Sequence, residues 1–262
     1  MNKADVSIVI PCYNDGKYIR ESVESVVKYS GDLKLEVIIV NDGSTDDNTL
    51  SELNNIKQEY KVVLLNQPNK RMSAARNFGI QYSKAPFIVA LDADDLLNAD
   101  FIDPAYNILV KDETIGVVYG NCEYFGAKQG VQEMNFDKTA QWYKNTINIT
   151  TLFRKKLWED CRGFDEDMKD GYEDWELWIN AMIRGWKFTK LDMTSFKYRI
   201  KNVSVNQVAT SKHHDLLNYI HRKHIKAFLT SFIDLHRENN DIINNRKRLL
   251  NYLKNNILGR KN

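Results

Sequence analysis

The chain has 262 residues, a formal net charge of +2, and 43% hydrophobic and 27% charged residues, an ordinary composition for a globular protein of one large or two small domains. Its three cysteines, Cys12, Cys122 and Cys161, are widely spaced and odd in number, which argues against a disulfide framework and favours a reducing compartment. The segment MNKADVSIVIP lacks signal-peptide architecture, and no apolar run approaches the ~18 residues of a bilayer span. We therefore expect a cytoplasmic protein.

Strand-like and helix-like segments alternate through the first part of the chain. Short apolar runs predict strands at 6–10, 35–40, 62–65 and 87–91. Between them we expect a helix at 17–29, a helix after the turn cluster NDGSTDD with Ser44 or Thr45 as its N-cap, and a helix at 73–83. Pro11 is expected to stop the first strand. Such alternation predicts an α/β fold with a mostly parallel central sheet and helices on both faces.

The second part of the chain is less regular. We expect a helix at 101–110, a strand or hairpin at 116–125, a loop at 126–144, a strand at 147–153, a helix from Asp174, and short edge strands at 188–191 and 196–200. Two amphipathic helices follow, at 217–235 and from Ile243 to Ile257. The pattern divides the chain into an α/β domain at 1–205 and a C-terminal helical extension at 206–262.

Acidic side chains follow two of the expected strands. The run FIVALDADDLL places Asp92, Asp94 and Asp95 after one strand, and Asp42 follows another. Carboxyl ends of parallel strands open on the crevice where such sheets bind ligands. In extended geometry Asp92 and Asp94 point to the same side, and two hard oxygen donors suit Mg²⁺ or Mn²⁺ holding a diphosphate. The alternatives are a strand end that meets a polar loop and, for Asp42, a turn former.

Three further charged residues have ordinary interpretations when each is taken alone. Arg76 lies on an expected helix, where arginine is usually solvated or salt-bridged. Glu173 and Asp174 stand at a helix N-terminus, where negative charge is favourable. Their order and spacing relative to the strand-end acids favour a shared function.

Five motifs in series carry a family resemblance: VSIVIPCYND, VIIVNDGSTDD, SAARNFGI, FIVALDADD and GYEDWELW. In order and spacing they resemble the family 2 glycosyltransferases, over about residues 5–200. The resemblance implies a GT-A fold, in which the α/β domain is catalytic. It also implies transfer of a sugar from a nucleotide-sugar with inversion of configuration.

The resemblance implies donor-binding roles in three of these motifs. Pro11, Tyr13 and Asn14 correspond to the first nucleotide-binding loop. Asp42 corresponds to the acid that accepts a hydrogen bond from a uracil ring, and Arg76 to an arginine at the nucleotide pocket. The expected donor is therefore a UDP-sugar.

The fourth motif is expected to hold a metal cofactor, Mn²⁺ or Mg²⁺. Asp92, Ala93 and Asp94 correspond to the Asp-x-Asp motif at the nucleotide-sugar, with Asp94 as the direct metal ligand and Asp95 as an adjacent alternative. A divalent cation between the phosphates stabilises the negative charge that grows on the leaving diphosphate.

The fifth motif is expected to supply the general base. Asp174 corresponds to that base, with Glu173 beside it. Direct displacement at the anomeric carbon needs one base, which takes the proton of the acceptor hydroxyl. Trp175 and Trp178 are candidates for stacking on sugar faces, and Trp178 is alternatively a core residue.

The sequence departs from the family pattern in two places. Lys70 and Arg71 stand where glycines are frequent, either as phosphate contacts or as exposed charges. Lys201 stands where many members carry a histidine that is sometimes a metal ligand. His213 or His214 would have to substitute for it, and the alternative is that both are ordinary helix-start residues.

The end of the chain is basic. From Ser211 to Asn262 it has 11 Lys or Arg residues against 4 Asp or Glu residues. One interpretation is peripheral docking on the anionic inner membrane face, where lipid-linked acceptors lie. The other is a solvated face on helices that pack against the catalytic domain. No basic–aromatic platform for nucleic acid accompanies the charge. The expected partners are a nucleotide-sugar donor and a glycan or lipid-linked acceptor, in surface polysaccharide or glycan synthesis.

Other functions fit the sequence less well. A sugar nucleotidyltransferase needs a Gly-rich phosphate loop, and the loop here is PCYNDG. A phosphatase of the haloacid dehalogenase type usually has Thr or Val after its second Asp, where Asp95 and Leu96 stand here. A nucleotide-sugar-binding module without catalysis is disfavoured by Asp174.

Overall fold

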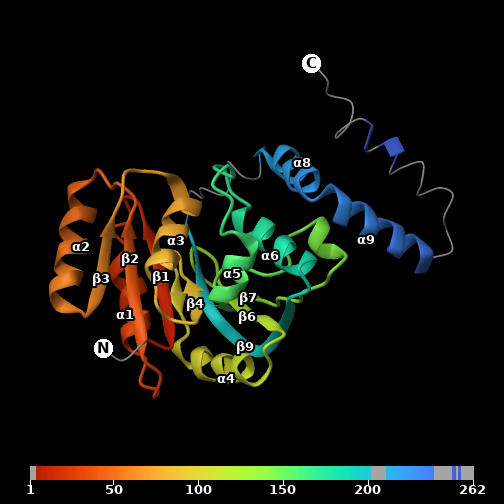
Figure 1. The fold of residues 1–262 in the computed structure, drawn as a ribbon. Coiled ribbons are helices and arrows are strands. Elements are labelled where there is room, and N and C mark those ends of the chain that lie inside the picture. The colour runs from red at the N-terminus through yellow and green to blue at the C-terminus, as the bar shows by residue number, and fades with distance from the viewer. Residues whose placement is uncertain (1–3, 202–210, 239–249, 252, 255–262) are drawn as a thin grey trace.

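The computed structural model describes residues 4–201, 211–238, 250–251 and 253–254. These residues form an α/β fold around one nine-stranded sheet (Figure 1). The strand order is β3-β2-β1-β4-β8-β6-β9-β5, and β7 pairs with β6. The expected α/β class is confirmed.

The first four strands of the sheet are parallel: β1 (Val6–Cys12), β2 (Leu35–Asn41), β3 (Val62–Asn66) and β4 (Phe87–Ala90). Three helices alternate with them as expected: α1 (Ile19–Val27), α2 (Asp47–Glu59) and α3 (Arg71–Tyr82). Helix α3 lies close against the sheet at Gly79, where a Cβ would lie 2.4 Å from Cγ1 of Val9. This close approach fixes the helix that carries Arg76.

Pro11 does not end the first strand, contrary to expectation, because β1 continues to Cys12. The carbonyl of Val9 bonds Leu91 on the β4 side, and alternate residues of a strand face the same neighbour. Pro11 thus faces β4 at a point where β4 has already ended. Its missing N–H costs no ladder hydrogen bond.

The N-cap of α2 also differs from expectation. Asp46, and not Ser44 or Thr45, is the N-cap, and its carboxylate accepts a hydrogen bond from the N–H of Thr49 at 2.8 Å. Ser44 and Thr45 instead bond Asn14, through the Asn14 N–H and side chain. Their hydroxyls therefore join two loops and do not start the helix.

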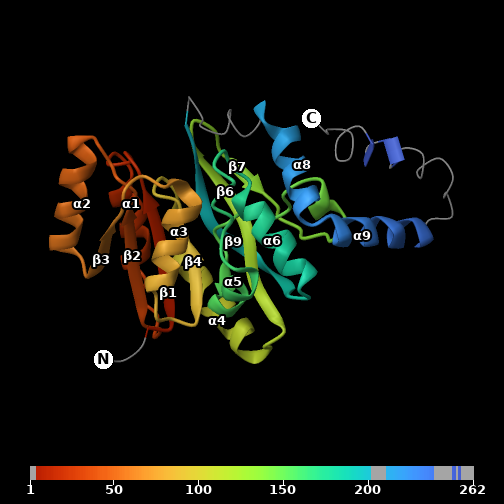
Figure 2. The same cartoon turned by 45° about the horizontal axis from the view of Figure 1, so that its top comes forward.

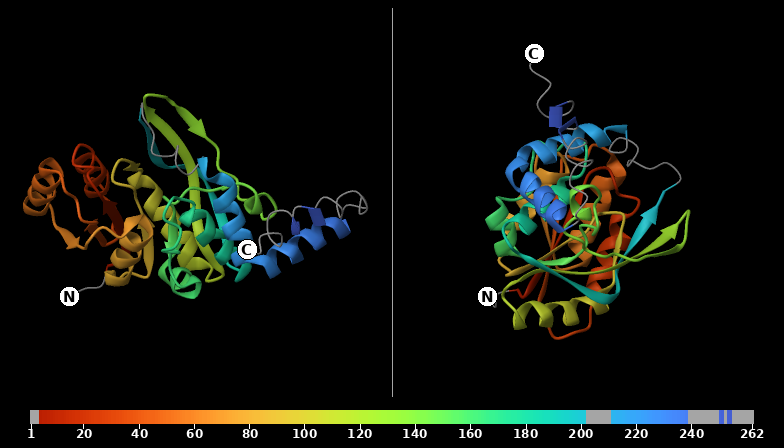
Figure 3. Two further views of the ribbon diagram at one scale, coloured as in Figure 1. Left: turned by 90° about the horizontal axis from the view of Figure 1, so that it is seen from above. Right: turned by 90° about the vertical axis from the view of Figure 1, so that its right-hand side faces the viewer.

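The second part of the chain adds five strands and five helical segments. In chain order these are β5 (Leu96–Leu97), η1 (Ala99–Phe101), α4 (Ile102–Lys111), β6 (Ile115–Gly126), β7 (Gly130–Gln132), η2 (Ala140–Trp142), β8 (Leu152–Arg154), α5 (Lys155–Cys161), α6 (Glu173–Ile183) and β9 (Lys187–Ile200). The strands β6 and β7 form a hairpin that stands out from the body of the protein (Figure 3).

Three expectations for this part were wrong. The strand expected at 147–153 begins only at Leu152, and an unexpected helix, α5, follows it directly. The two edge strands expected at 188–191 and 196–200 are one strand, β9, which lies inside the sheet between β6 and β5. The loop expected at 126–144 contains β7 and η2. The strands among these elements are fixed by pairing with distant strands, which local periodicity does not report.

Helices cover both faces of the sheet, as expected. Helices α1, α2 and α4 bury apolar residues against one face, in a cluster that includes Ile8, Ile39 and Val89. Helices α3, α5 and α6 pack on the other face, where Trp178 is fully buried beside Phe153. Figure 2 shows α3 and α6 over neighbouring parts of the same face. Trp178 is therefore a core residue, which was one of its two expected interpretations.

The helix expected at 217–235 is two helices, α8 (His213–Lys223) and α9 (Ile225–Glu238), separated at His224. Both pack over α6 in a third apolar cluster that contains Trp175, Ile220 and Phe228. His213 and His214 are helix-start residues, as one interpretation held. Most of the helix expected from Ile243 to Ile257, and the expected boundary at 205, lie outside the described residues. None of the helices in the described part is long and apolar enough to cross a membrane.

Candidate active site

Three loops that carry expected site residues leave neighbouring strands at the same edge of the sheet. Cys12 pairs with Asn41 at the ends of β1 and β2, and β4 ends beside Val9 of β1. The loops that begin at Tyr13, Asp42 and Leu91 therefore emerge side by side. This edge is where an open α/β sheet binds its ligand.

Arg76 joins two of the acidic motifs. Its guanidinium donates to Oδ1 of Asp92 at 2.6 Å and to Oε1 of Glu173, 97 residues further along the chain. The side chain is 3% exposed and lies over the ring of Phe164. Burial alone would lower the pKa of Arg76, but the charges of Asp92 and Glu173 raise it above its ordinary value. Arg76 is thus a permanent cation between β4 and α6.

Asp174 lies in the first turn of α6, beside this ion-pair network. Its Oδ2 accepts a hydrogen bond from Nδ2 of Asn145 at 2.9 Å, and its Oδ1 accepts one from the Trp175 N–H at 2.7 Å. Burial and the neighbouring charge of Glu173 raise the pKa of Asp174 to about 7, against the opposing effect of Arg76. A carboxyl group with that pKa exchanges a proton near neutral pH.

A cavity of about 510 Å³ opens at these residues. Of the expected site residues, Arg76, Asp92, Asp95, Glu173, Asp174 and Trp175 line it. Its remaining walls are mostly polar and aromatic, with His213 and with tyrosines from β6, the N-cap of α6, β9 and the segment before Asn145. The cavity therefore combines a cation, several acids and flat rings, which suits a sugar.

Asp92, Asp94 and Asp95 lie on a turn and not on an extended segment. The N–H of Asp95 bonds the carbonyl of Asp92 at 3.1 Å. The expectation that extended geometry points Asp92 and Asp94 to one side is therefore wrong: Asp92 bonds Arg76, whereas Asp94 bonds Lys201. Burial, with the charges of Asp92 and Asp94, raises the pKa of Asp95 well above its ordinary value. Asp95 accepts the Arg199 N–H at 2.9 Å.

Asp42 holds the beginning of α3. Its carboxylate accepts hydrogen bonds from the N–H groups of Lys70 and Arg71 and from the side chain of Gln67, at 2.7 to 2.9 Å. Asp42 is 3% exposed. The side chains of Lys70 and Arg71 are exposed. Asp42 thus caps the N-terminus of the helix that carries Arg76.

The remaining expected residues have mixed positions. Pro11 and Ala93 are buried, and Tyr13 is 45% exposed beside Asn14. Asn14 has a left-handed backbone and ties its loop to the N–H groups of Thr45 and Asp46. Trp175 is only 2% exposed, and its indole N–H donates to the carbonyl of Gln141.

Two contributors to this region were not found from the sequence. Asn145 stands in a segment without a helical or strand pattern, so only the structure reveals its bond to Asp174. Lys201 was noted only as a departure from the family pattern, and its Nζ lies 2.7 Å from Oδ2 of Asp94. Both contacts join segments that are far apart in sequence, and no local signal could have found them.

The acids fit a metal ion only if a ligand completes its coordination shell. In the described part of the chain, no three His, Cys, Asp or Glu side chains converge as metal ligands. Asp92 and Asp94 are each about one quarter exposed, and each has one oxygen engaged by a basic side chain. Mg²⁺ and similar ions commonly take one or two carboxylates plus substrate phosphates. A cation at Asp94 therefore fits when a diphosphate supplies the remaining ligands.

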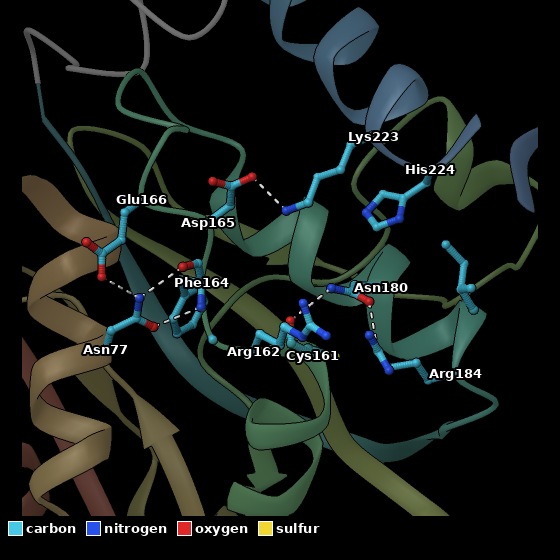
Figure 4. A pocket seen from close by; sticks show the side chains of 12 residues that line it. Asn77, Cys161, Arg162, Phe164, Asp165, Glu166, Asn180, Arg184, Lys223 and His224 are labelled. Atoms are coloured by element: carbon cyan, nitrogen blue, oxygen red, sulfur yellow. Dashed lines mark hydrogen bonds and ion pairs between the residues drawn. The ribbon is translucent and has the colours of Figure 1, made fainter. Parts of the chain in front are cut away.

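A larger cavity of about 680 Å³ lies elsewhere on α6. Figure 4 shows Asn77 at its edge, where the Asn77 side chain bonds Glu166 and the backbone of Phe164. At the other side Lys223 bonds Asp165, and Asn180 accepts a hydrogen bond from Arg184. None of the expected site residues lines this cavity. Its contribution is indirect, because Asn77 positions the Phe164 ring under Arg76.

Two solved structures have a fold similar to that of this chain. S. aureus TarS 1-349 in complex with UDP-GlcNAc has a TM-score of 0.70 and 19% identity, over 82% of this chain and 65% of that one. The mannosyltransferase PcManGT from Pyrobaculum calidifontis, in complex with GDP-Man and Mn²⁺, has a TM-score of 0.66 and 19% identity, over 86% of this chain and 65% of that one. The shared fold is GT-A, as expected.

Sequence comparison identifies the family. A chondroitin synthase from Pasteurella multocida is 28% identical over 215 residues, which are 79% of this chain and 22% of the synthase. The chain spans less than half the length of this relative and of two other curated relatives. The family model for "Glycosyl transferase family 2" matches residues 7–166. The chain therefore belongs to glycosyl transferase family 2.

Proposed function

We propose that this protein is an inverting glycosyltransferase that moves a sugar from a nucleoside-diphosphate sugar, a UDP-sugar, to an acceptor hydroxyl. The observation that carries the proposal is the convergence of Arg76, Asp92, Glu173 and Asp174 at one cavity, from three separate motifs. Family membership supports glycosyl transfer, and a neighbour of the same fold binds UDP-GlcNAc.

On the donor side, the chain's own residues would hold the nucleotide and the diphosphate. The loops with Tyr13 and Asn14 and with Asp42 would bind the nucleoside, and Arg76 would keep the Asp92 carboxylate in place. Mn²⁺ or Mg²⁺, held by Asp94, would supply positive charge for the leaving diphosphate. The fold neighbour solved with Mn²⁺ supports that cofactor.

On the acceptor side, Asp174 would act as the general base. The acceptor oxygen attacks the anomeric carbon, the bond from that carbon to the diphosphate oxygen breaks, and the hydroxyl proton passes to Asp174. A single displacement inverts the configuration, and one carboxylate suffices for it. The pKa of Asp174, raised to about 7 by burial and by Glu173, gives the carboxylate more basicity than an ordinary aspartate.

The acceptor is proposed to be a glycan or a lipid-linked sugar in polysaccharide synthesis. The support is the similarity to chondroitin synthase and to a minor teichoic acid biosynthesis protein from Bacillus subtilis. The tyrosines around the cavity are suited to sugar rings. We place the reaction in the cytoplasm.

The proposal is tested by incubating the protein with a panel of UDP-sugars and sugar acceptors in the presence of Mn²⁺. We expect release of UDP that depends on acceptor, and a product whose anomeric configuration by NMR is opposite to that of the donor. UDP-sugar binding without turnover over a broad acceptor panel would favour a binding module instead. A product with retained configuration would contradict the single displacement.

A further inference from the structure

Lys201 forms an ion pair with Asp94, the residue that the proposed function assigns as the metal ligand. Its Nζ lies 2.7 Å from Oδ2 of Asp94 and 3.4 Å from Oδ1 of Asp15. The ammonium also lies 4.7 Å from the centre of the Tyr18 ring. Lys201 is about one quarter exposed and follows directly after the end of β9. A tethered cation therefore already stands at the Asp94 carboxylate.

The end of β9 is held firmly next to the acidic turn. The Arg199 N–H donates to Asp95, and Nε of Arg199 donates to the carbonyl of Asp94 at 2.8 Å. The guanidinium lies between the rings of Tyr18 and Phe125. These contacts fix the backbone two residues before Lys201. The ion pair between Lys201 and Asp94 is thus part of an anchored arrangement and not a chance contact of a loose side chain.

Two acids of the turn, Asp92 and Asp94, have basic side chains as partners. Asp92 is paired with Arg76, and Asp94 and Asp15 share Lys201. In the described part of the chain, no other basic side chain is paired with Asp94. A divalent cation on Asp94 and the ammonium of Lys201 would repel each other at such short range. Metal binding at Asp94 is therefore disfavoured while Lys201 holds Oδ2.

A diphosphate offers Lys201 a place to move to. Phosphate oxygens are strong acceptors for an ammonium, and lysine has a flexible four-carbon stem with three rotatable donors. We propose that Lys201 is a tethered counter-ion that closes Asp94 in the nucleotide-free protein and transfers to the diphosphate when the donor binds. Asp94 then accepts a divalent cation only together with the nucleotide. The inference rests on the proposed function, because it needs a diphosphate at this site.

The test measures binding of Mn²⁺ to the full chain by the loss of the free Mn²⁺ signal in electron paramagnetic resonance. Three variants are compared with the unchanged protein: Lys201→Met, Lys201→Arg, which keeps the charge, and Lys197→Met. Lys197 is the matched control, because it lies on β9 just before Lys201 and pairs with Glu123 and not with Asp94. Circular dichroism establishes that each variant is folded.

Without nucleotide, we expect Lys201→Met to bind Mn²⁺ at least about tenfold more tightly than the unchanged protein, since a close unit charge changes the affinity of a carboxylate for a proton by a similar or larger factor. Lys201→Arg and Lys197→Met should bind Mn²⁺ weakly, like the unchanged protein. With UDP present, the unchanged protein should gain Mn²⁺ affinity, and Lys201→Met should gain less. Equal Mn²⁺ affinity of Lys201→Met and the unchanged protein would overturn the inference.

Calorimetric titration of UDP in EDTA separates this inference from the proposed function. We expect the unchanged protein to bind UDP without metal and Lys201→Met to bind it about tenfold more weakly, because one charge-assisted contact is lost. Equal affinities would also count against Lys201. Failure of the unchanged protein to bind UDP under any condition would instead contradict the proposed function, whatever the Mn²⁺ result.

Discussion

Nδ2 of Asn145 lies 2.9 Å from Oδ2 of Asp174. This hydrogen bond favours the charged form of the carboxylate, and it comes from the segment before β8 and not from α6 itself. The side chain of Gln141 bonds Asn145 and Thr146, so the donor is supported from behind. The contact makes Asn145 a positioning residue for the proposed base and leads to the first prediction.

Replacing Asn145 with Leu should raise the pKa of Asp174. A hydrogen bond to a charged group is worth ~1.5–3 kcal/mol. Because water replaces part of the lost bond, we expect the pKa of Asp174 to rise by about one unit. The measurement is the pH dependence of kcat/KM for UDP-sugar turnover. The acid limb should move to higher pH, while the rate at high pH falls much less. A uniform fall at all pH values would show that Asn145 has only a structural role.

Activity should depend on pH with an acid limb near neutrality. The base works only when deprotonated, and burial and Glu173 raise the pKa of Asp174 to about 7. Below that pH the rate should fall about tenfold per pH unit, and above it the rate should level off. A profile that stays flat down to pH 5 would show that Asp174 is not the group that takes the proton.

Glu173→Gln should move the same acid limb in the opposite direction. The charge of Glu173 is the second-largest cause that raises the pKa of Asp174, so its removal stabilises the Asp174 carboxylate. The acid limb of the rate profile should then lie at lower pH than in the unchanged protein. Glu166→Gln, which removes an exposed acid that bonds Asn77 outside the active-site cavity, is the control. An upward shift would contradict the assignment.

Arg76→Met should destabilise the protein as well as the site. Removing one partner of a buried ion pair leaves uncompensated charge and costs ~3–5 kcal/mol. Here two acids, Asp92 and Glu173, lose their common partner. Urea unfolding followed by circular dichroism measures the loss, and Arg162→Met, at an exposed arginine, should change stability by less than ~0.5 kcal/mol. Equal stability of the two variants would show that the network carries little free energy.

Glu176→Gln should loosen the C-terminal helices. Glu176 is fully buried in the first turn of α6, and its Oε1 bonds Nζ of Lys223 at 3.0 Å and Nε2 of His224 at 2.6 Å. These bonds hold the junction of α8 and α9. Compared with the unchanged protein, the variant should show faster amide hydrogen exchange in α8, while exchange in β1 and β4 stays the same. Unchanged exchange in α8 would show that its apolar contacts alone hold it.

The sequence predicts the first half of the fold well because each strand there carries its own signal. The strands β1, β2 and β4 are buried on both faces, so their sequences are continuous apolar runs. Parallel strands also need long crossover connections, which are usually helices. The second half was predicted poorly because pairing decides it. β9 is one strand only through its long alignment with β6, and its own residues show no such continuity.

The candidate site divides in the same way. Asp92, Arg76 and Asp174 were predicted because each stands in a motif with a recognisable neighbourhood, and the structure brings them to one cavity. The partners Asn145 and Lys201 were not predicted as partners, because hydrogen bonds across 29 and 107 residues leave no local pattern. The role of Asp42 as a helix cap was missed for the same reason, since its partners lie beyond β3.

The measurement that tests the central claim most directly is the single-turnover rate of Asp174→Asn at saturating UDP-sugar and acceptor, together with its affinity for UDP. We predict normal UDP affinity and a rate lowered by at least about a hundredfold, the usual contribution of a positioned general base. Asp192→Asn, at an exposed aspartate of β9, should leave both unchanged. Full activity of Asp174→Asn would contradict the account.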